Sequence, residues 1–73
     1  MEKEKFYSMV YKLVEDYFTN FSKKPHYLLI NSQIDLTNYL DDQEDLKQYV
    51  NDKFKGMTIV RTPDISSDKV VVY

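Results

Sequence analysis

The chain lacks several residue types altogether. It has no cysteine, no alanine and no tryptophan, and only one histidine and one glycine among its 73 residues. Without cysteine there is neither a disulfide nor a thiolate nucleophile, and a single histidine offers no cluster for a structural zinc ion. One glycine excludes the glycine-rich phosphate loops and the nucleophile elbow of hydrolases. Most nucleotide-binding and covalent-catalysis classes are therefore excluded.

Long apolar runs are also missing. No segment approaches the ~20 consecutive apolar residues that cross a bilayer, and the N-terminus leads into an amphipathic pattern rather than a signal-peptide h-region. The net charge of −2 argues against direct binding to nucleic acid, which favours a basic face. We therefore expect a cytoplasmic protein with no membrane segment.

Large side chains make up for the missing crosslinks. Hydrophobic residues account for 42% of the chain and aromatic residues for 15%. The length predicts a single domain over residues 1–73, and a domain of this size buries only ~60% of its unfolded surface. Its stability must come from dense packing of these side chains.

Residues 1–22 are predicted to form a long amphipathic helix. The apolar residues recur at helical spacing and form one continuous stripe. Pro25 disfavours helix at the residue before it, so the helix should end near Asn20 to Ser22. The stripe consists of Phe6, Met9, Val10, Leu13, Val14, Tyr17, Phe18 and Phe21.

The rest of the chain predicts an α+β fold in the order α-β-α-β-β. Residues 26–31 form a short apolar run, typical of a strand buried on both faces. Residues 35–55 have a helical pattern, in which we expect a short helix at 35–40 and a longer one at 42–54, either separate or fused. Gly56 should stop that helix, and residues 57–62 and 69–73 should form a C-terminal β-hairpin. The helical crossover favours parallel pairing of the first two strands. We therefore expect the long helix to pack on a three-stranded mixed sheet.

Ionisable residues offer few candidates for chemistry. His26 follows a proline at a strand entrance and has no nucleophile or carboxylate near it in sequence, so we expect a packing role. The acids Asp41, Asp42, Glu44 and Asp45 lack the alternation and the central glycine of a calcium loop. They are typical of a solvated helix start, or of an acidic patch that docks on a basic partner. We predict no catalytic residue, metal or cofactor.

The first helix carries the candidate partner interface. Its apolar face is wider than a small sheet requires, which indicates either burial within the monomer or a surface for a homodimer or another protein. The candidate interface residues are Phe6, Tyr7, Met9, Tyr11 and Phe18.

The second half of the chain contains four short motifs at a recognisable spacing. These motifs are Lys24-Pro25-His26-Tyr27-Leu28-Leu29-Ile30-Asn31, then Asn38-Tyr39-Leu40, then Phe54-Lys55-Gly56-Met57-Thr58-Ile59-Val60, and finally Val70-Val71-Val72-Tyr73. The pattern resembles the C-terminal part of HK97-type coat proteins and small orphan proteins of phages that infect low-GC Gram-positive bacteria. The resemblance implies that Pro25 and Asn31 bound the first strand and that Gly56 forms a helix-to-strand corner.

Together these observations predict a small non-catalytic phage or prophage accessory protein that acts by protein–protein binding in the host cytoplasm. The alternative is an acidic decoy that inhibits a host nucleic-acid-binding protein through the four clustered acids. An enzyme is not predicted.

Overall fold

The long N-terminal helix forms as its apolar stripe predicts. A computed structural model, which describes residues 2–73, has helix α1 at Lys3–Phe21. The helix ends at Ser22, whose φ of 56° is left-handed and whose backbone N–H donates to the Phe18 carbonyl at 2.8 Å. This αL cap satisfies a carbonyl that the last turn would otherwise leave without a partner. The predicted end of the helix is confirmed, and Met1 lies outside the described residues.

Within residues 2–73 the sheet is mixed as predicted, but it has four strands instead of the three predicted, in the order β2-β3-β1-β4. The central strands β1 (Tyr27–Asn31) and β3 (Met57–Thr62) run parallel, as the crossover between them predicted. The edges are β2 (Lys53–Phe54) and β4 (Val71–Val72), each only two residues long. Short edge strands offer few unpaired backbone groups to other chains.

The predicted hairpin between residues 57–62 and 69–73 is wrong. Strand β4 pairs antiparallel with β1, with Leu28 opposite Val72, and does not neighbour β3. One edge of β3 is taken by β2 and the other by β1. The chain therefore returns to the free edge of β1, where Val70 becomes buried beside the core.

The hairpin lies instead between β2 and β3, and it contains Gly56. The two turn residues, Lys55 and Gly56, have φ values of 50° and 83°. A two-residue turn with both φ values positive is the type I′ turn, which matches the twist of the strands that it joins. Gly56 is therefore a hairpin residue and not the helix-to-strand corner that was predicted.

The predicted helical region over residues 35–55 is divided into two parts as expected, and both parts are shorter than predicted. It contains a 3₁₀ turn, η1 (Leu36–Asn38), and helix α2 (Gln43–Tyr49). The chain leaves the helix through Asp52, whose φ is 55°. Phe54, the last apolar residue of the predicted helical pattern, lies instead in strand β2, where it is fully buried in the core.

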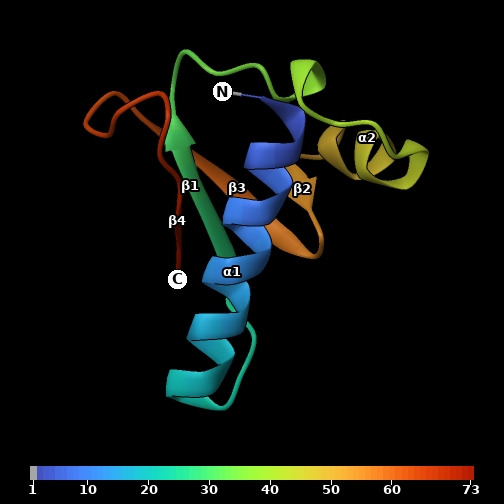
Figure 1. The fold of residues 1–73 in the computed structure, drawn as a ribbon. Helices are drawn as coiled ribbons and strands as arrows, with labels where there is room; N and C mark the ends of the chain where they lie inside the picture. The colour runs from blue at the N-terminus through green and yellow to red at the C-terminus, as the bar shows by residue number, and fades with distance from the viewer. Residues whose placement is uncertain (1) are drawn as a thin grey trace.

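Among the described residues, helices cover only one face of the sheet (Figure 1). Figure 1 shows α1 lying across this face, with α2 beside the β2 edge. Leu28 and Ile30 of β1 are fully buried under α1, whereas Tyr27 on the opposite face is 42% exposed. The prediction that this strand is buried on both faces is therefore wrong. Among residues 2–73 no helix combines the length and the apolar character that crossing a membrane requires.

Candidate binding surface on the first helix

The N-terminal half of α1 belongs to the core. Phe6 is fully buried, with its ring centroid 5.8 Å from that of Tyr39 and 5.5 Å from that of Phe54. Tyr7 and Met9 are partly buried against the same core. Of the predicted interface residues, Phe6 therefore has no surface to offer a partner, because the sheet and α2 region use it for packing.

The C-terminal half of α1 extends past the sheet (Figure 1). A 19-residue helix is about 28 Å long at ~1.5 Å per residue, whereas the five-residue strand β1 covers about 17 Å. The helix therefore has more apolar stripe than the sheet can cover. Tyr11 and Phe18 are each 53% exposed, and Phe21 is 59% exposed.

These exposed rings share one side of the helix. Tyr11, Val14, Phe18 and Phe21 follow one another at intervals of three, four and three residues, which places them along one face. We call this set the α1 strip. Tyr11 and Phe18 were among the predicted interface residues, and the structure leaves both accessible. Val14 and Phe21 complete a surface that the prediction only partly included.

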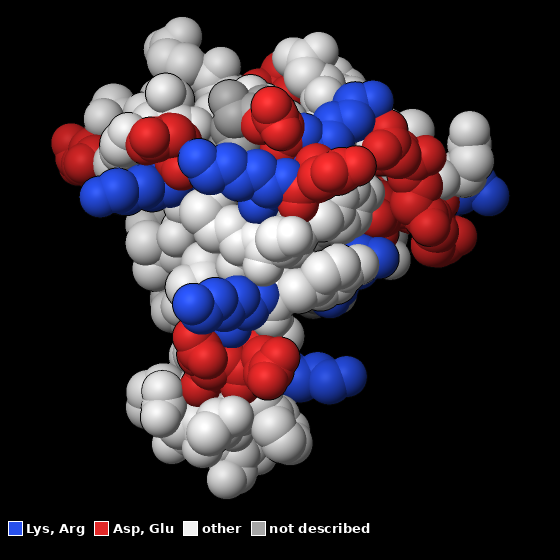
Figure 2. Space-filling model, viewed as in Figure 1, with Lys and Arg blue, Asp and Glu red and all other residues white. Residues whose placement is uncertain are grey.

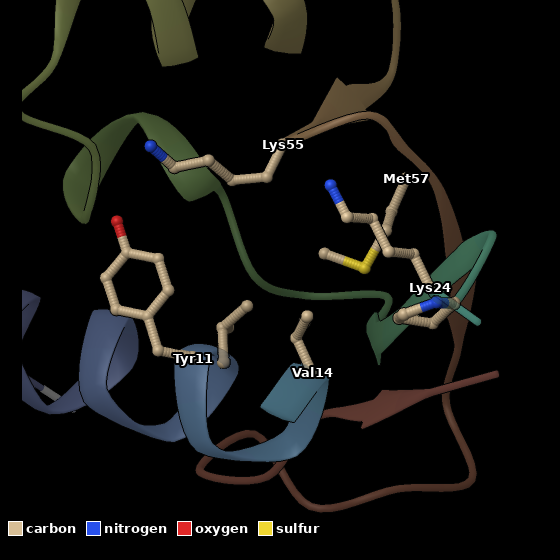
Figure 3. A pocket seen from close by; sticks show the side chains of 7 residues that line it. Tyr11, Val14, Lys24, Lys55 and Met57 are labelled. Carbon is tan, nitrogen blue, oxygen red and sulfur yellow. The ribbon is translucent and has the colours of Figure 1, made fainter. Parts of the chain in front are cut away.

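A hollow of about 310 Å³ adjoins the α1 strip (Figure 3). Its base is apolar, because Val10 is 1% exposed and Met57 is 3% exposed. We call it the lysine hollow, since two lysines stand at its rim. It is lined by Val10, Tyr11, Val14, Lys24, Pro25, Lys55 and Met57.

Lys55 is held at the rim by a buried carboxylate. Its Nζ lies 3.2 Å from Oδ1 of Asp45, which is only 1% exposed, and the Tyr7 hydroxyl donates to Oδ2 of Asp45 at 2.9 Å. The Lys55 ammonium also lies 6.0 Å and 5.8 Å from the ring centroids of Tyr7 and Tyr11. Such cation–π contacts favour the charged amine.

The same contacts determine the protonation states of Tyr7 and Lys55. Burial, together with the hydrogen bond to Asp45, raises the pKa of the Tyr7 hydroxyl. Burial lowers the pKa of Lys55, but the hydrogen bond to Asp45 and the charge of Asp45 outweigh it and raise that pKa on balance. Tyr7 is therefore neutral and Lys55 cationic at neutral pH.

Lys24 adds a second positive charge at the rim of the hollow. Among residues 2–73, Lys24 takes part in no ion pair, whereas Lys55 is paired with Asp45. Figure 3 shows the Lys24 side chain extending over the hollow from the segment after α1, and Lys55 entering from the β2–β3 turn. An apolar base with one free ammonium at its rim fits an apolar side chain that has a carboxylate beside it.

The predicted acidic patch divides into residues with separate local roles. Figure 2 shows acidic side chains gathered at the right of the molecule, over the region of α2. Asp41 forms an ion pair with Lys3 at 2.6 Å, and Asp42 caps α2 by accepting from the Glu44 N–H at 2.7 Å. Because Asp45 is buried, the four acids do not form one exposed patch.

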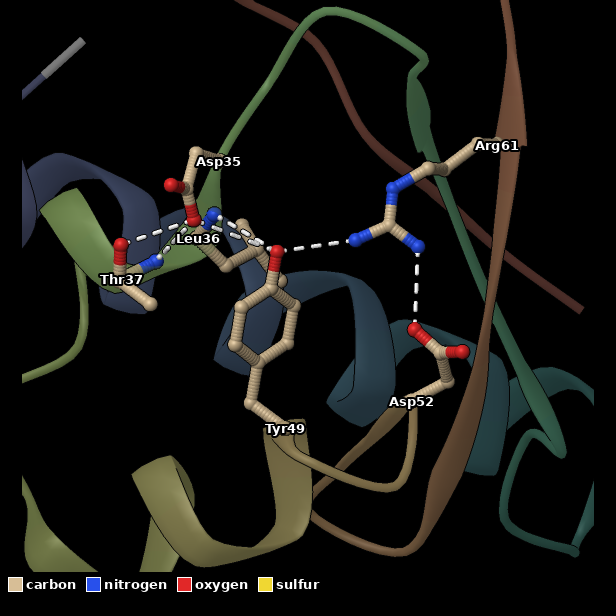
Figure 4. Close-up of polar contacts among 6 residues, drawn as sticks. All are labelled: Asp35, Leu36, Thr37, Tyr49, Asp52 and Arg61. Atoms are coloured by element: carbon tan, nitrogen blue, oxygen red, sulfur yellow. Dashed lines mark hydrogen bonds and ion pairs between the residues drawn. The ribbon is translucent and has the colours of Figure 1, made fainter.

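A second polar cluster, which sequence reasoning missed, surrounds Tyr49 (Figure 4). The Tyr49 hydroxyl accepts from Arg61 Nη2 at 2.9 Å and from the Leu36 N–H at 3.3 Å, and donates to Asp35 at 3.4 Å. Arg61 Nη1 in turn donates to Asp52 at 3.1 Å. The hydroxyl has no hydrogen-bonding capacity left for a ligand. The cluster fastens η1 and α2 to β3.

His26 lies apart from any catalytic arrangement. Its side chain is exposed, and its ring centroid is 6.5 Å from that of Tyr27 in an edge contact. Its backbone N–H donates to the Tyr73 carbonyl at 2.8 Å, which helps to join β4 to β1. Across residues 2–73, no three or more histidine, aspartate or glutamate side chains are grouped so that they could hold a metal ion.

Comparison of the chain with protein-family models, with curated proteins and with solved structures finds no match in any of the three. The resemblance to phage proteins therefore stays a prediction, and the function must be argued from the surface itself.

Proposed function

We propose that this is a non-catalytic protein that acts by binding another protein chain through the α1 strip and the lysine hollow. One observation carries the proposal: Phe18 and Phe21, 53% and 59% exposed, project on a part of α1 that the sheet does not cover, next to an apolar hollow. Contiguous exposed apolar surface of this kind marks interaction sites in monomeric proteins.

The hollow specifies the chemistry of the partner. Val10, Met57 and Pro25 provide an apolar base that suits an aliphatic or aromatic side chain. Lys24 at the rim suits a carboxylate near that side chain. Burial of aromatic side chains at the centre of an interface supplies most of the binding energy, and charges at the rim supply orientation.

This proposal keeps the predicted accessory role in a phage or prophage and gives the acidic decoy less weight. A decoy needs its carboxylates on the surface, and Asp45 is buried against Lys55 and Tyr7 while Asp42 caps a helix. The decoy retains the exposed Asp41, Asp42 and Glu44, but Asp41 is paired with Lys3 and Asp42 is used as the cap of α2.

Site-specific photo-crosslinking tests the proposal. A photoreactive phenylalanine analogue would replace Phe18 in one sample and Val50 in the control, since Val50 is an exposed apolar residue (83%) on another part of the surface. In the native cell, position 18 should yield a discrete crosslinked protein that position 50 does not yield. The product should also be lost when Tyr11 is changed to serine. Equal, diffuse crosslinking at both positions would contradict the proposal.

A further inference from the structure

The α1 strip and the lysine hollow complement each other, which identifies an occupant. Resting on the proposed function, we propose that a second copy of this chain fills the site, with its α1 antiparallel to the first and the two helices crossing near Val14. The partner's Phe18 then covers the hollow beside Tyr11, and the partner's Glu15 faces Lys24.

The spacing of the strip suits such a pairing. Tyr11 precedes Val14 by three residues and Phe18 follows it by four, so Val14 lies near the midpoint between the two rings. In an antiparallel pair about this midpoint, Phe18 of one helix lies beside Tyr11 of the other, and the reverse holds on the other side. A two-fold interface uses the same patch twice, so each contact is made twice.

Glu15, which borders the strip, and Lys24, which lines the hollow, carry opposite charges. Glu15 precedes Phe18 by three residues and is therefore its neighbour on the helix surface. It is exposed and takes part in no ion pair among residues 2–73, which is also true of Lys24. The strip thus carries the aromatic ring, and Glu15 beside the strip carries the carboxylate, for which the hollow is suited. Two free charges of opposite sign are brought together by the pairing.

The shape of the fold leaves room for the second copy. Figure 1 shows the C-terminal half of α1 extending past the sheet, and Phe18 and Phe21 on this half are 53% and 59% exposed, so this part of the strip is open to a second helix. Tyr11 and Val14 belong to both the strip and the lining of the hollow, so a helix seated on the strip also covers the hollow. One partner helix therefore covers both features.

Sedimentation equilibrium over micromolar to millimolar concentrations, combined with charge reversal, tests this inference. The unmodified chain should form a dimer. Lys24→Glu and Glu15→Lys should each weaken dimerisation by about tenfold or more, because each places like charges in contact. The double variant restores opposite charges and should return the dissociation constant to within about threefold of the original. Lys23→Glu is the matched control, since Lys23 does not line the hollow, and should leave dimerisation unchanged.

The outcomes separate this inference from the proposed function. A chain that is monomeric at every concentration, or a dimer that both reversals leave unchanged, overturns the second copy as occupant. A crosslink from position 18 to a different protein would then keep the binding function. No specific crosslink, to itself or to another chain, would reject both. Should a reversal variant fail to fold by circular dichroism, Phe18→Ser provides the same test, because that ring is exposed in the monomer.

Discussion

The two halves of α1 share one apolar pattern and have different surroundings. In the N-terminal half, Phe6 and Val10 are 0% and 1% exposed, while in the C-terminal half Phe18 and Phe21 are 53% and 59% exposed. The apolar spacing is the same along the whole helix. The difference in exposure therefore arises from the sheet, which ends before the helix does. An apolar stripe thus becomes core where strands lie beneath it and becomes a candidate interface where they do not.

The largest expected contrast between the halves comes from removing one ring from each. Phe6→Ala should destabilise the fold by about 3–5 kcal/mol, because a fully buried phenylalanine leaves a cavity among Tyr39, Phe54 and the strands. In a domain of this size such a loss can leave much of the chain unfolded. Phe18→Ala should change stability by less than about 0.5 kcal/mol in dilute solution, where the chain is monomeric. Urea denaturation measures both, and similar losses for the two variants would contradict the division of the helix.

This division shows what periodicity can and cannot predict. The spacing from Phe6 to Phe21 correctly predicts a helix with one apolar side, because that information is local. It does not indicate where the sheet ends, because the lengths of β1 and β3 are set elsewhere in the chain. The predicted interface therefore combined the buried Phe6 with the exposed Tyr11 and Phe18.

The error in the predicted strand pairing also arises because local sequence does not determine long-range contacts. The parallel pairing of β1 and β3 was predictable, since a helical crossover separates two apolar runs. The partner of β4 was not, because residues 69–73 could pair with either neighbour, and only the turn at Lys55–Gly56, which gives β3 its neighbour β2, decides between them. The lysine hollow was likewise hidden, as its residues come from α1, from the segment after it and from the β2–β3 hairpin.

The second-largest effect on stability should come from Lys55, which contacts Asp45 and Tyr7 and also lines the lysine hollow. Lys55→Met leaves the buried Asp45 carboxylate with Tyr7 as its hydrogen-bond donor among the side chains, and should cost roughly 1–3 kcal/mol. The lower part of that range is expected because the lysine is 37% exposed, so water partly screens the pair. Lys53→Met is the control, since Lys53 is an exposed residue of the same hairpin and should lose less than about 0.5 kcal/mol. Thermal unfolding of both variants checks the difference.

Alkaline pH should reduce the stability that Tyr7, Asp45 and Lys55 provide through their contacts. Burial and the bond to Asp45 raise the folded-state pKa of Tyr7 above its ordinary value of 10.0, so the folded protein holds this proton more tightly than the unfolded chain. Its contribution to stability is therefore complete below pH 10.0 and is lost as the pH rises through the folded-state pKa. The raised pKa of Lys55 acts in the same direction.

The measurement is the free energy of unfolding from neutral pH to above pH 10.0. The comparison is with Tyr7→Phe, which keeps the ring, removes the hydroxyl and leaves every other residue unchanged. The stability of the unmodified protein should decline more steeply with pH than that of the variant. Parallel curves would mean that Tyr7 and Asp45 do not interact in solution as their 2.9 Å contact indicates.

The smallest effect should come from the last turn of α1. Phe21→Ser removes an exposed ring whose one aromatic contact is with Tyr17, at a centroid distance of 4.6 Å. Exposed pairs at i and i+4 contribute about 0.2–0.5 kcal/mol, so the free energy of unfolding should fall by no more than this amount in dilute solution, where the chain is monomeric. A loss above about 1 kcal/mol would mean that the end of the helix is covered within the monomer, and the α1 strip would then belong to the core rather than to an interface.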